Sequence, residues 1–324
     1  MGSNPTLSAT WRASYLANAL RIGLVGLGKI ARDQHLPAIA ATEGVELVAI
    51  ASRNAVLDDI PSFKSLDEML GSKTGFDAVV LCQPPSARFD DARRALIAGK
   101  HVFLEKPPGA TVSEVELLAK LAQSANVTLF GSWHSRFGAA VSAAKAWLAD
   151  HRATAITINW KEDIRQWHPG QDWILKNDGF GVFDPGINAL SILTEIIGEP
   201  VRVAEASLHL PTNRQAPIAA DVTLMTASGT AIAAAFDFRQ TGPQLWDIVI
   251  EAGANRLQLR QGGHMLTIND IDQHIAPTAE YPAMYRHFLK LTNDARSDID
   301  ITPLQLVADI FLTGRYVATD PFEF

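Results

Sequence analysis

The chain has 324 residues, a formal net charge of −7, and 47% hydrophobic against 19% charged residues. This length exceeds what a single hydrophobic core usually supports, so we expect two globular domains. No basic block offsets the negative charge, which argues against a nucleic-acid partner, and no run reaches the roughly 20 apolar residues of a membrane helix. The single cysteine, Cys82, excludes an intramolecular disulfide and favours a cytoplasmic protein.

Residues 20–135 alternate between apolar strands and amphipathic helices. Strands are predicted at 20–28, 45–51, 78–82, 101–104 and 128–130, and helices after 29 and at 65–70, 88–98 and 112–124. Strands this apolar belong to a parallel sheet that helices cover on both faces. We therefore predict an α/β protein with an N-terminal Rossmann domain at residues 20–135, which follows a polar extension of residues 1–19.

The pattern changes near residue 153, and residues 136–324 are predicted to form an α+β domain. Alternating strands are expected at 156–160, 220–225 and 231–238, hairpin turns at 228–229, 253–254 and 262–263, and helices at 137–150, 185–197, 281–295 and 303–313. Short alternating strands joined by tight turns are typical of antiparallel sheets. We therefore expect a C-terminal domain with a mostly antiparallel open sheet.

A glycine-rich turn follows the first predicted strand. Gly26 and Gly28 lie between this strand and a helix, where glycines allow backbone amides to approach a pyrophosphate. The alternative is a turn without a ligand. After the second strand, Ser52 and Arg53 occupy the place where an NAD-specific site carries an acid, so we expect NADP to be accepted alongside NAD. The alternative for Arg53 is an exposed side chain without a ligand.

Three motifs in order give a family resemblance. GLGKIA at 26–31, LEKP at 104–107 and GVFDPGIN at 181–188 resemble the Gfo/Idh/MocA oxidoreductase family. The resemblance covers nearly the whole chain. It implies NAD or NADP as cofactor, a second domain that forms the substrate site, and a homo-oligomer, dimer or tetramer.

Longer stretches resemble the bacterial aldose 1-dehydrogenases of that family. They are KIARDQHLPAI at 29–39, LEKPPGAT at 104–111, WHSR at 133–136, WKEDIRQWHPGQ at 160–171 and GVFDPGINALSI at 181–192. This resemblance implies oxidation of a free aldose at C1 to the lactone, with galactose ahead of arabinose. The alternatives are another sugar or polyol dehydrogenase of the family and a catalytically silent NAD(P)-binding sensor.

Three residues are the candidates for catalysis. Lys106 follows a strand at the carboxyl edge of the predicted parallel sheet, where such sheets bind ligands, although a local ion pair with Glu105 is the plainer interpretation. Asp184 and Asn188 lie four residues apart, so one helix face presents both. The plainer interpretation of Asp184 is a helix N-cap. The resemblance implies that Asp184 accepts the anomeric proton and that Asn188, where the family usually has His, binds the sugar. Lys106 with a lowered pKa is a competing base.

The remaining site predictions form two sets. The cofactor set comprises Gly26, Gly28, Lys29, Ile30, Ser52, Arg53, Cys82, Pro84, Pro85, Glu105 and Lys106. The sugar set comprises His134, Glu162, Asp163, Trp167, His168, Asp184, Asn188 and Trp246. Aromatic faces and polar groups together suit a pyranose, although each residue alone is more often a packed aromatic or a surface charge. His35 is interpreted as structural, and no metal is expected because the histidines lack ligand spacing.

Overall fold

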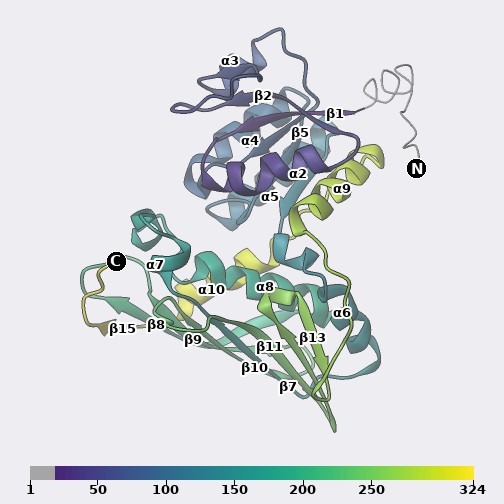
Figure 1. Ribbon diagram of the computed structural model, residues 1–324. Coiled ribbons are helices and arrows are strands. Elements are labelled where there is room, and N and C mark those ends of the chain that lie inside the picture. Colours follow the sequence, from purple (N-terminus) through teal and green to yellow (C-terminus); the bar gives the residue numbers. More distant parts are fainter. Residues whose placement is uncertain (1–18) are drawn as a thin grey trace, which may run out of the picture. The chain divides into compact units, whose positions relative to one another are not determined.

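The computed structural model describes residues 19–324, which form two compact units (Figure 1). The first unit contains the described residues up to Gly109, with Ser113–Ser132 and Tyr281–Ile299. The second contains residues 110–112, Trp133–Glu280 and Asp300–Phe324. Residues 1–18 of the predicted extension lie outside the described residues. The domain boundary predicted after residue 135 stays a prediction. Residues 281–299, which the sequence places in the second domain, pack within the first unit.

The first unit is built on a parallel sheet, as predicted. Its strands are β1 (Leu20–Val25), β2 (Val45–Ala51), β3 (Ser62–Phe63), β4 (Ala78–Leu81), β5 (His101–Glu105) and β6 (Leu129–Ser132). Their order is β3-β2-β1-β4-β5-β6, and every pairing is parallel. The carboxyl ends of β1, β4 and β5 therefore meet at one edge, where the glycine turn and the loop after β5 begin.

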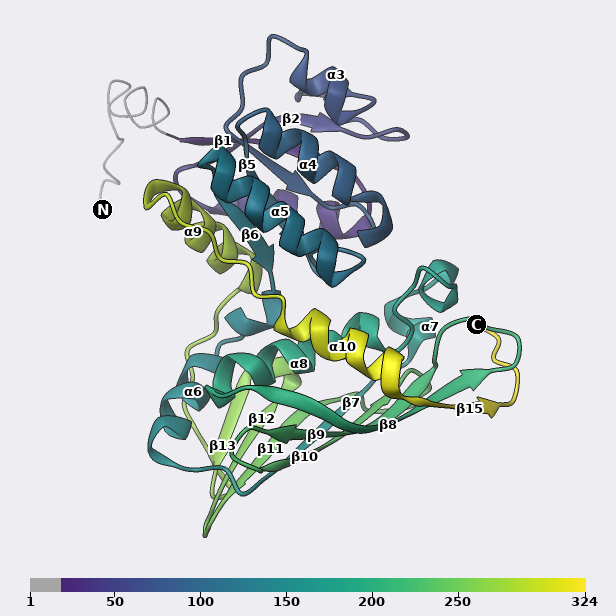
Figure 2. The ribbon, with the colours of Figure 1, turned by 180° about the vertical axis from the view of Figure 1, so that it is seen from behind.

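Helices cover both faces of this sheet (Figures 1 and 2). They are η1 (Ala31–His35), α2 (Leu36–Ala41), α3 (Leu66–Leu70), η2 (Pro85–Ala87), α4 (Phe89–Ile97), α5 (Val112–Ala125) and α9 (Glu280–Asn293). On one face, α3, α4 and α5 bury Met69, Leu96 and Leu118 against the sheet. On the other, Tyr285 of α9 stacks on Phe103 with ring centroids 5.2 Å apart. Burial on both faces explains why the strands are so uniformly apolar.

The first helix begins with a turn of π-helix, which the sequence did not indicate. The Leu36 N–H donates to the carbonyl of Ala31, five residues back, and Pro37 lies at the start of α2. Proline has no N–H and cannot continue the regular α-helical ladder, so the chain changes its hydrogen-bond spacing just before it.

The second unit contains a nine-stranded mixed sheet. Its strands are β7 (Ala155–Lys161), β8 (Val201–Pro211), β9 (Ala219–Thr226), β10 (Ala231–Asp237), β11 (Leu245–Ala252), β12 (Asn255–Arg260), β13 (Met265–Ile268), β14 (Ile271–Asp272) and β15 (Arg315–Thr319). The order is β14-β13-β12-β11-β7-β10-β9-β8-β15. Only the β7–β10 and β8–β15 pairs among these described strands are parallel, so the predicted mostly antiparallel sheet is confirmed.

Three long helices cover one face of this sheet (Figure 2). They are α6 (Val141–Asp150), α8 (Phe183–Ile197) and α10 (Thr302–Thr313), and shorter turns are η3 (His134–Phe137), α7 (Ile164–Trp167), η4 (Asp172–Leu175) and η5 (Gln261–Gly263). Gly186 lets α8 approach the sheet closely, because a Cβ there would lie 2.8 Å from the Phe236 ring. In residues 19–324 no helix is long and apolar enough to cross a membrane.

Candidate active site

The glycine turn has the geometry that close approach of a dinucleotide needs. Gly26 has φ +92°, and a Cβ there would lie 3.1 Å from the backbone nitrogen of Gln83. Gly28 is exposed, and a Cβ on it would meet no described atom within 4 Å. Lys29 and Ile30 follow on the exposed side, with Lys29 paired to Asp33. The residues present therefore fit a bound pyrophosphate.

The end of β2 carries cationic rather than acidic side chains. The Ser52 N–H donates to the carbonyl of Phe63, which fixes the backbone, and Arg53 is exposed. Lys64 donates from Nζ to the Arg53 carbonyl at 3.3 Å, so a second cation lies beside this turn. Two cationic residues lie at the end of β2, where an NAD-specific site carries an acid, and they fit a ribose that carries a 2′-phosphate.

The loop after β5 contains Lys106 and is fixed by buried polar groups. The Lys106 backbone N–H donates to the Glu105 carboxylate, and the Lys106–Pro107 peptide is cis. Arg88, which is 2% exposed, donates to the carbonyls of Glu105, Pro107 and Gln83. Burial lowers the pKa of Arg88 to about 10, so the guanidinium stays charged at neutral pH.

Glu105 is also the centre of a buried cluster. The Tyr281 hydroxyl donates to Glu105 Oε1 at 2.6 Å, and His35 lies 3.2 Å from the same oxygen and 2.8 Å from the Tyr285 hydroxyl. Burial acts to lower the pKa of His35, but Cys82 and the Glu105 carboxylate raise it to about 10. These contacts agree with a structural role for His35. Cys82 and Pro85 are buried at the end of β4, and Pro84 is exposed.

Asp184 and Asn188 both lie on α8 and are buried, at 7% and 8% exposure. The preceding turn positions the start of the helix, since the Asp184 N–H donates to the carbonyl of Gly181 at 2.9 Å. Among the described residues, Asn188 Oδ1 has no hydrogen-bond partner. A buried acceptor without a donor is uncommon in folded proteins, so this oxygen is suited to a ligand hydroxyl.

A chain of polar side chains leads away from Asp184. His168 Nδ1 lies 3.8 Å from Asp184 Oδ2, and His168 Nε2 lies 3.0 Å from Glu162 Oε1. Trp246 donates from Nε1 to the second Glu162 oxygen at 2.9 Å. Glu162 is 5% exposed, so its carboxylate depends on these two donors. The structure therefore brings together four members of the predicted sugar set.

Trp167 and Asp163 lie at the edge of this group. Trp167 is 43% exposed, and its ring packs edge-on against Trp246 with centroids 5.1 Å apart. The two indoles border a hollow of about 510 Å³, whose other lining residues are Gln244, Asp247, Arg260, Gln261 and Met265. Asp163 caps α7 instead, and both of its oxygens accept hydrogen bonds from Arg165. That contact favours a structural role for Asp163.

His134 belongs to a different local cluster. Its Nδ1 lies 2.6 Å from Glu280 Oε2, and His264 Nε2 lies 3.1 Å from the other oxygen. Burial acts to raise the pKa of Glu280, but the two imidazoles lower it to about 2. A sugar ligand of His134 would have to share the imidazole with this carboxylate.

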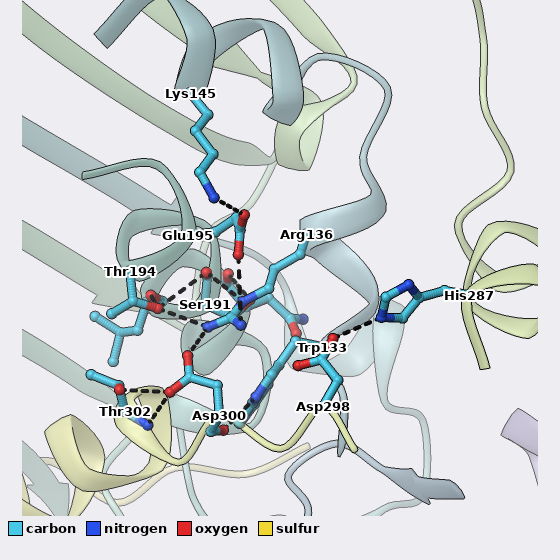
Figure 3. A network of polar contacts seen from close by, with 12 residues as sticks. Trp133, Arg136, Lys145, Ser191, Thr194, Glu195, His287, Asp298, Asp300 and Thr302 are labelled. Atoms are coloured by element: carbon cyan, nitrogen blue, oxygen red, sulfur yellow. Dashed lines mark hydrogen bonds and ion pairs between the residues drawn. The ribbon is translucent and has the colours of Figure 1, made fainter. Parts of the chain in front are cut away.

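Arg136 joins η3 to Ser191 and Thr194 of α8 (Figure 3). It donates from Nε to the Ser191 carbonyl and from Nη2 to the Thr194 hydroxyl, both at 3.0 Å, and pairs with Asp300. Burial acts to raise the pKa of Asp300, but the hydrogen bonds from Arg136 and Thr302 lower it. In the first unit, His287 pairs with Asp298 at 2.8 Å.

Arg88 and Arg136 were missed as supporting residues. Arg136 is the last residue of the WHSR motif, and no role was assigned to its charge. A charged residue inside a motif could have indicated an ion pair, which the structure shows with Asp300. Arg88 gave no such signal, because an arginine at the start of a predicted helix normally lies on the surface.

Comparison with known proteins identifies the family of the N-terminal domain and two near full-length relatives. The Gfo/Idh/MocA profile, described as an oxidoreductase family with an NAD-binding Rossmann fold, matches residues 20–132. Galactose 1-dehydrogenase of Pseudomonas fluorescens is 43% identical over 303 residues, which cover 94% of this chain and 98% of the relative. Residues 20–132 are therefore an NAD-binding Rossmann domain.

Two solved structures extend the comparison. The crystal structure of the D-galactose-1-dehydrogenase protein from Rhizobium etli has a TM-score of 0.91 and 48% identity, covering 94% of this chain and 98% of that one. A 3-ketoreductase from Actinomadura kijaniata, in complex with NADP and TDP-benzene, has a TM-score of 0.82 at 19% identity, covering 93% of this chain and all of that one. The second likeness concerns the fold alone.

Proposed function

Because this chain belongs to the Gfo/Idh/MocA oxidoreductase family, we propose that it is an NAD(P)-dependent dehydrogenase that oxidises D-galactose at C1 to the lactone. Two near full-length relatives named for galactose 1-dehydrogenase support the choice of sugar. The observation that carries the proposal is the buried Asp184, whose neighbour His168 is hydrogen-bonded to Glu162, which in turn accepts from Trp246. These side chains offer the hydrogen bonds and aromatic surface that a pyranose requires.

Oxidation at C1 requires removal of the proton from the anomeric hydroxyl. Asp184 is the proposed acceptor, because it is buried on α8 and His168 Nδ1 lies 3.8 Å from its Oδ2. Asn188 is uncharged and accepts a hydrogen bond from a sugar hydroxyl through Oδ1. Lys106 is proposed to orient the anomeric hydroxyl and the nicotinamide, and it is the competing candidate for the base.

The cofactor is NAD or NADP. Gly26, Gly28 and the amides after them would bind the pyrophosphate, and Ser52 and Arg53 the adenosine ribose or its 2′-phosphate. When bound, the nicotinamide supplies the acceptor for the hydride that leaves C1. The protein's own contribution is to orient the sugar and to take up its hydroxyl proton.

The finer predictions follow from the same reasoning. L-Arabinose is the second proposed substrate, because it differs from galactose by the exocyclic CH2OH and one pocket can tolerate that difference.

A homo-oligomer is proposed through the face of the nine-stranded sheet opposite α6, α8 and α10 (Figure 2). A cytoplasmic location is proposed from the single cysteine.

A substrate screen tests the proposal. Purified protein is incubated with NAD or NADP and, separately, with galactose, arabinose, glucose and an inositol, and absorbance of the reduced nicotinamide is followed. Galactose is expected to give the highest kcat/KM and arabinose the next. A preference for the inositol would indicate a polyol dehydrogenase of the same family. Tight cofactor binding without turnover of any of these compounds would indicate a sensor.

A further inference from the structure

Arg88 lies between η2 and α4 and is one of the largest fully buried side chains of the described residues. A buried guanidinium is costly unless hydrogen bonds compensate for its lost hydration. No part of the proposed chemistry uses this residue. Its burial therefore requires another explanation.

The partners of Arg88 are backbone carbonyls at two loops. Nη1 donates to the carbonyls of both Glu105 and Pro107, the residues on either side of Lys106. Nη2 donates to the carbonyl of Gln83, next to the predicted cofactor residues Pro84 and Pro85. One planar group thus connects the ends of β4 and β5 through three acceptors, a task for which the forked geometry of arginine is better suited than a lysine ammonium.

A second set of contacts reaches the same loop through the Glu105 side chain. Its carboxylate accepts hydrogen bonds from the Lys106 N–H and the Tyr281 hydroxyl. Arg88 binds the main-chain carbonyls, whereas Glu105 binds the main-chain N–H between them. Together they determine the backbone of residues 105–107 and so the direction in which the Lys106 side chain leaves it.

We propose that Arg88 is a positioning residue for Lys106, which it serves by fixing the carbonyls on both sides of that lysine. The inference rests on the proposed function, because Lys106 is assigned to the oxidation of the aldose. Without Arg88 the loop keeps its sequence but loses three donors, so Lys106 samples several positions. A displacement of about 1 Å in a reacting group can lower a rate roughly 100-fold.

The test compares Arg88→Ala, Arg88→Lys and a matched control, Arg94→Ala. Arg94 is on α4, and its side chain is 40% exposed and paired with Asp91 and Asp67. Arg88→Ala is expected to lower kcat for galactose about 100-fold while changing KM and the NADPH dissociation constant, measured by fluorescence, far less. Arg88→Lys is expected to stay at least about 10-fold slow, because it keeps the charge without the fork. Arg94→Ala is expected to match the wild type.

Chemical rescue separates positioning from general stability. Millimolar guanidinium is expected to restore part of the kcat of Arg88→Ala and to leave Arg94→Ala unchanged. A folded Arg88→Ala or Arg88→Lys protein with wild-type kcat would overturn the inference. If Arg88→Ala does not fold, the kcat of Arg88→Lys decides alone. An inactive wild-type protein would instead count against the proposed function, so the two failures are distinct.

Discussion

Buried charge is used differently in the two units. In the first, Arg88 bonds to main-chain carbonyls of the loops after β4 and β5, and the Glu105 carboxylate accepts from the Lys106 N–H as well as from the Tyr281 hydroxyl. In the second, Glu162, His168 and Trp246 bond to one another through their side chains. Contacts to the main chain fix the course of a loop, whereas contacts between side chains fix individual functional atoms. The comparison suggests that the first unit supplies rigidity and the second supplies recognition.

The second unit also retains an acceptor that its described residues do not satisfy, Asn188 Oδ1. An orphaned acceptor buried beside an acid is expected where a ligand completes the hydrogen bonding. Single substitutions in either unit test whether the first unit supplies rigidity and the second supplies recognition.

The largest effect is expected at Asp184. Asp184→Asn keeps the size of the side chain but removes its basic oxygen, so kcat should fall by roughly 100-fold or more. The galactose KM should change less, because most hydrogen bonds are kept. Steady-state kinetics over a range of pH measure both quantities.

Lys106→Ala distinguishes the two candidate bases. If Asp184 is the base, the acidic limb of the pH–rate profile should persist in Lys106→Ala, although the rate falls. The base role would belong to Lys106 under three joint results. Asp184→Asn would keep a near-normal kcat, Lys106→Ala would be inactive, and the acidic limb of the wild-type pH–rate profile would titrate well above the usual carboxylate range.

A smaller effect is expected from a substitution of Glu162, which should weaken binding of the sugar. Glu162→Gln removes the charged acceptor of His168 and Trp246, and a hydrogen bond to a charged group contributes about 1.5–3 kcal/mol. The galactose KM should therefore rise about 10-fold or more, with a smaller change in kcat. Asp221→Asn is the matched control, since that carboxylate pairs with His209 on the same sheet and lies outside the predicted sugar set. An equal KM change in both variants would show that Glu162 does not contact the sugar.

The preference for NADP over NAD should depend on the exposed side chain of Arg53. Arg53→Ala removes a guanidinium that only NADP can use, so kcat/KM with NADP should fall about 10-fold while that with NAD stays nearly constant. The ratio of the two values is the measurement. Equal losses with both cofactors would contradict the role assigned to Arg53.

The smallest effect concerns stability at low pH. The folded pKa of Glu280 is about 2, below its ordinary value of 4.5, so its stabilising effect is complete above about pH 4.5 and is lost as the pH falls toward 2. The difference in unfolding free energy between wild type and Glu280→Gln should therefore shrink on acidification from about pH 5, as urea unfolding would measure. A constant difference over this range would be inconsistent with the contacts to His134 and His264.

Local patterns predicted much of this molecule. The apolar strands, the glycine turn and the four-residue spacing of Asp184 and Asn188 are properties of short segments, and they specified the parallel sheet and the catalytic candidates. The strands β8 and β15 were not indicated, because their parallel pairing joins segments about a hundred residues apart. Likewise, the placement of α9 on the first sheet depends on the contact between Tyr285 and Phe103, which are far apart in the sequence. The role proposed for Arg88 depends on hydrogen bonds to backbone carbonyls, which no pattern of side chains predicts.

Oxidation at C1 is the central claim, and deuterium transfer tests it most directly. Galactose labelled with deuterium only at C1 is incubated with the protein and NAD or NADP, and the reduced cofactor is analysed by mass spectrometry. Because the C1 hydrogen leaves as hydride, the reduced cofactor should be heavier by one mass unit and the lactone should be free of the label. An unlabelled reduced cofactor together with a product that keeps deuterium at C1 would show oxidation at another carbon and contradict the account.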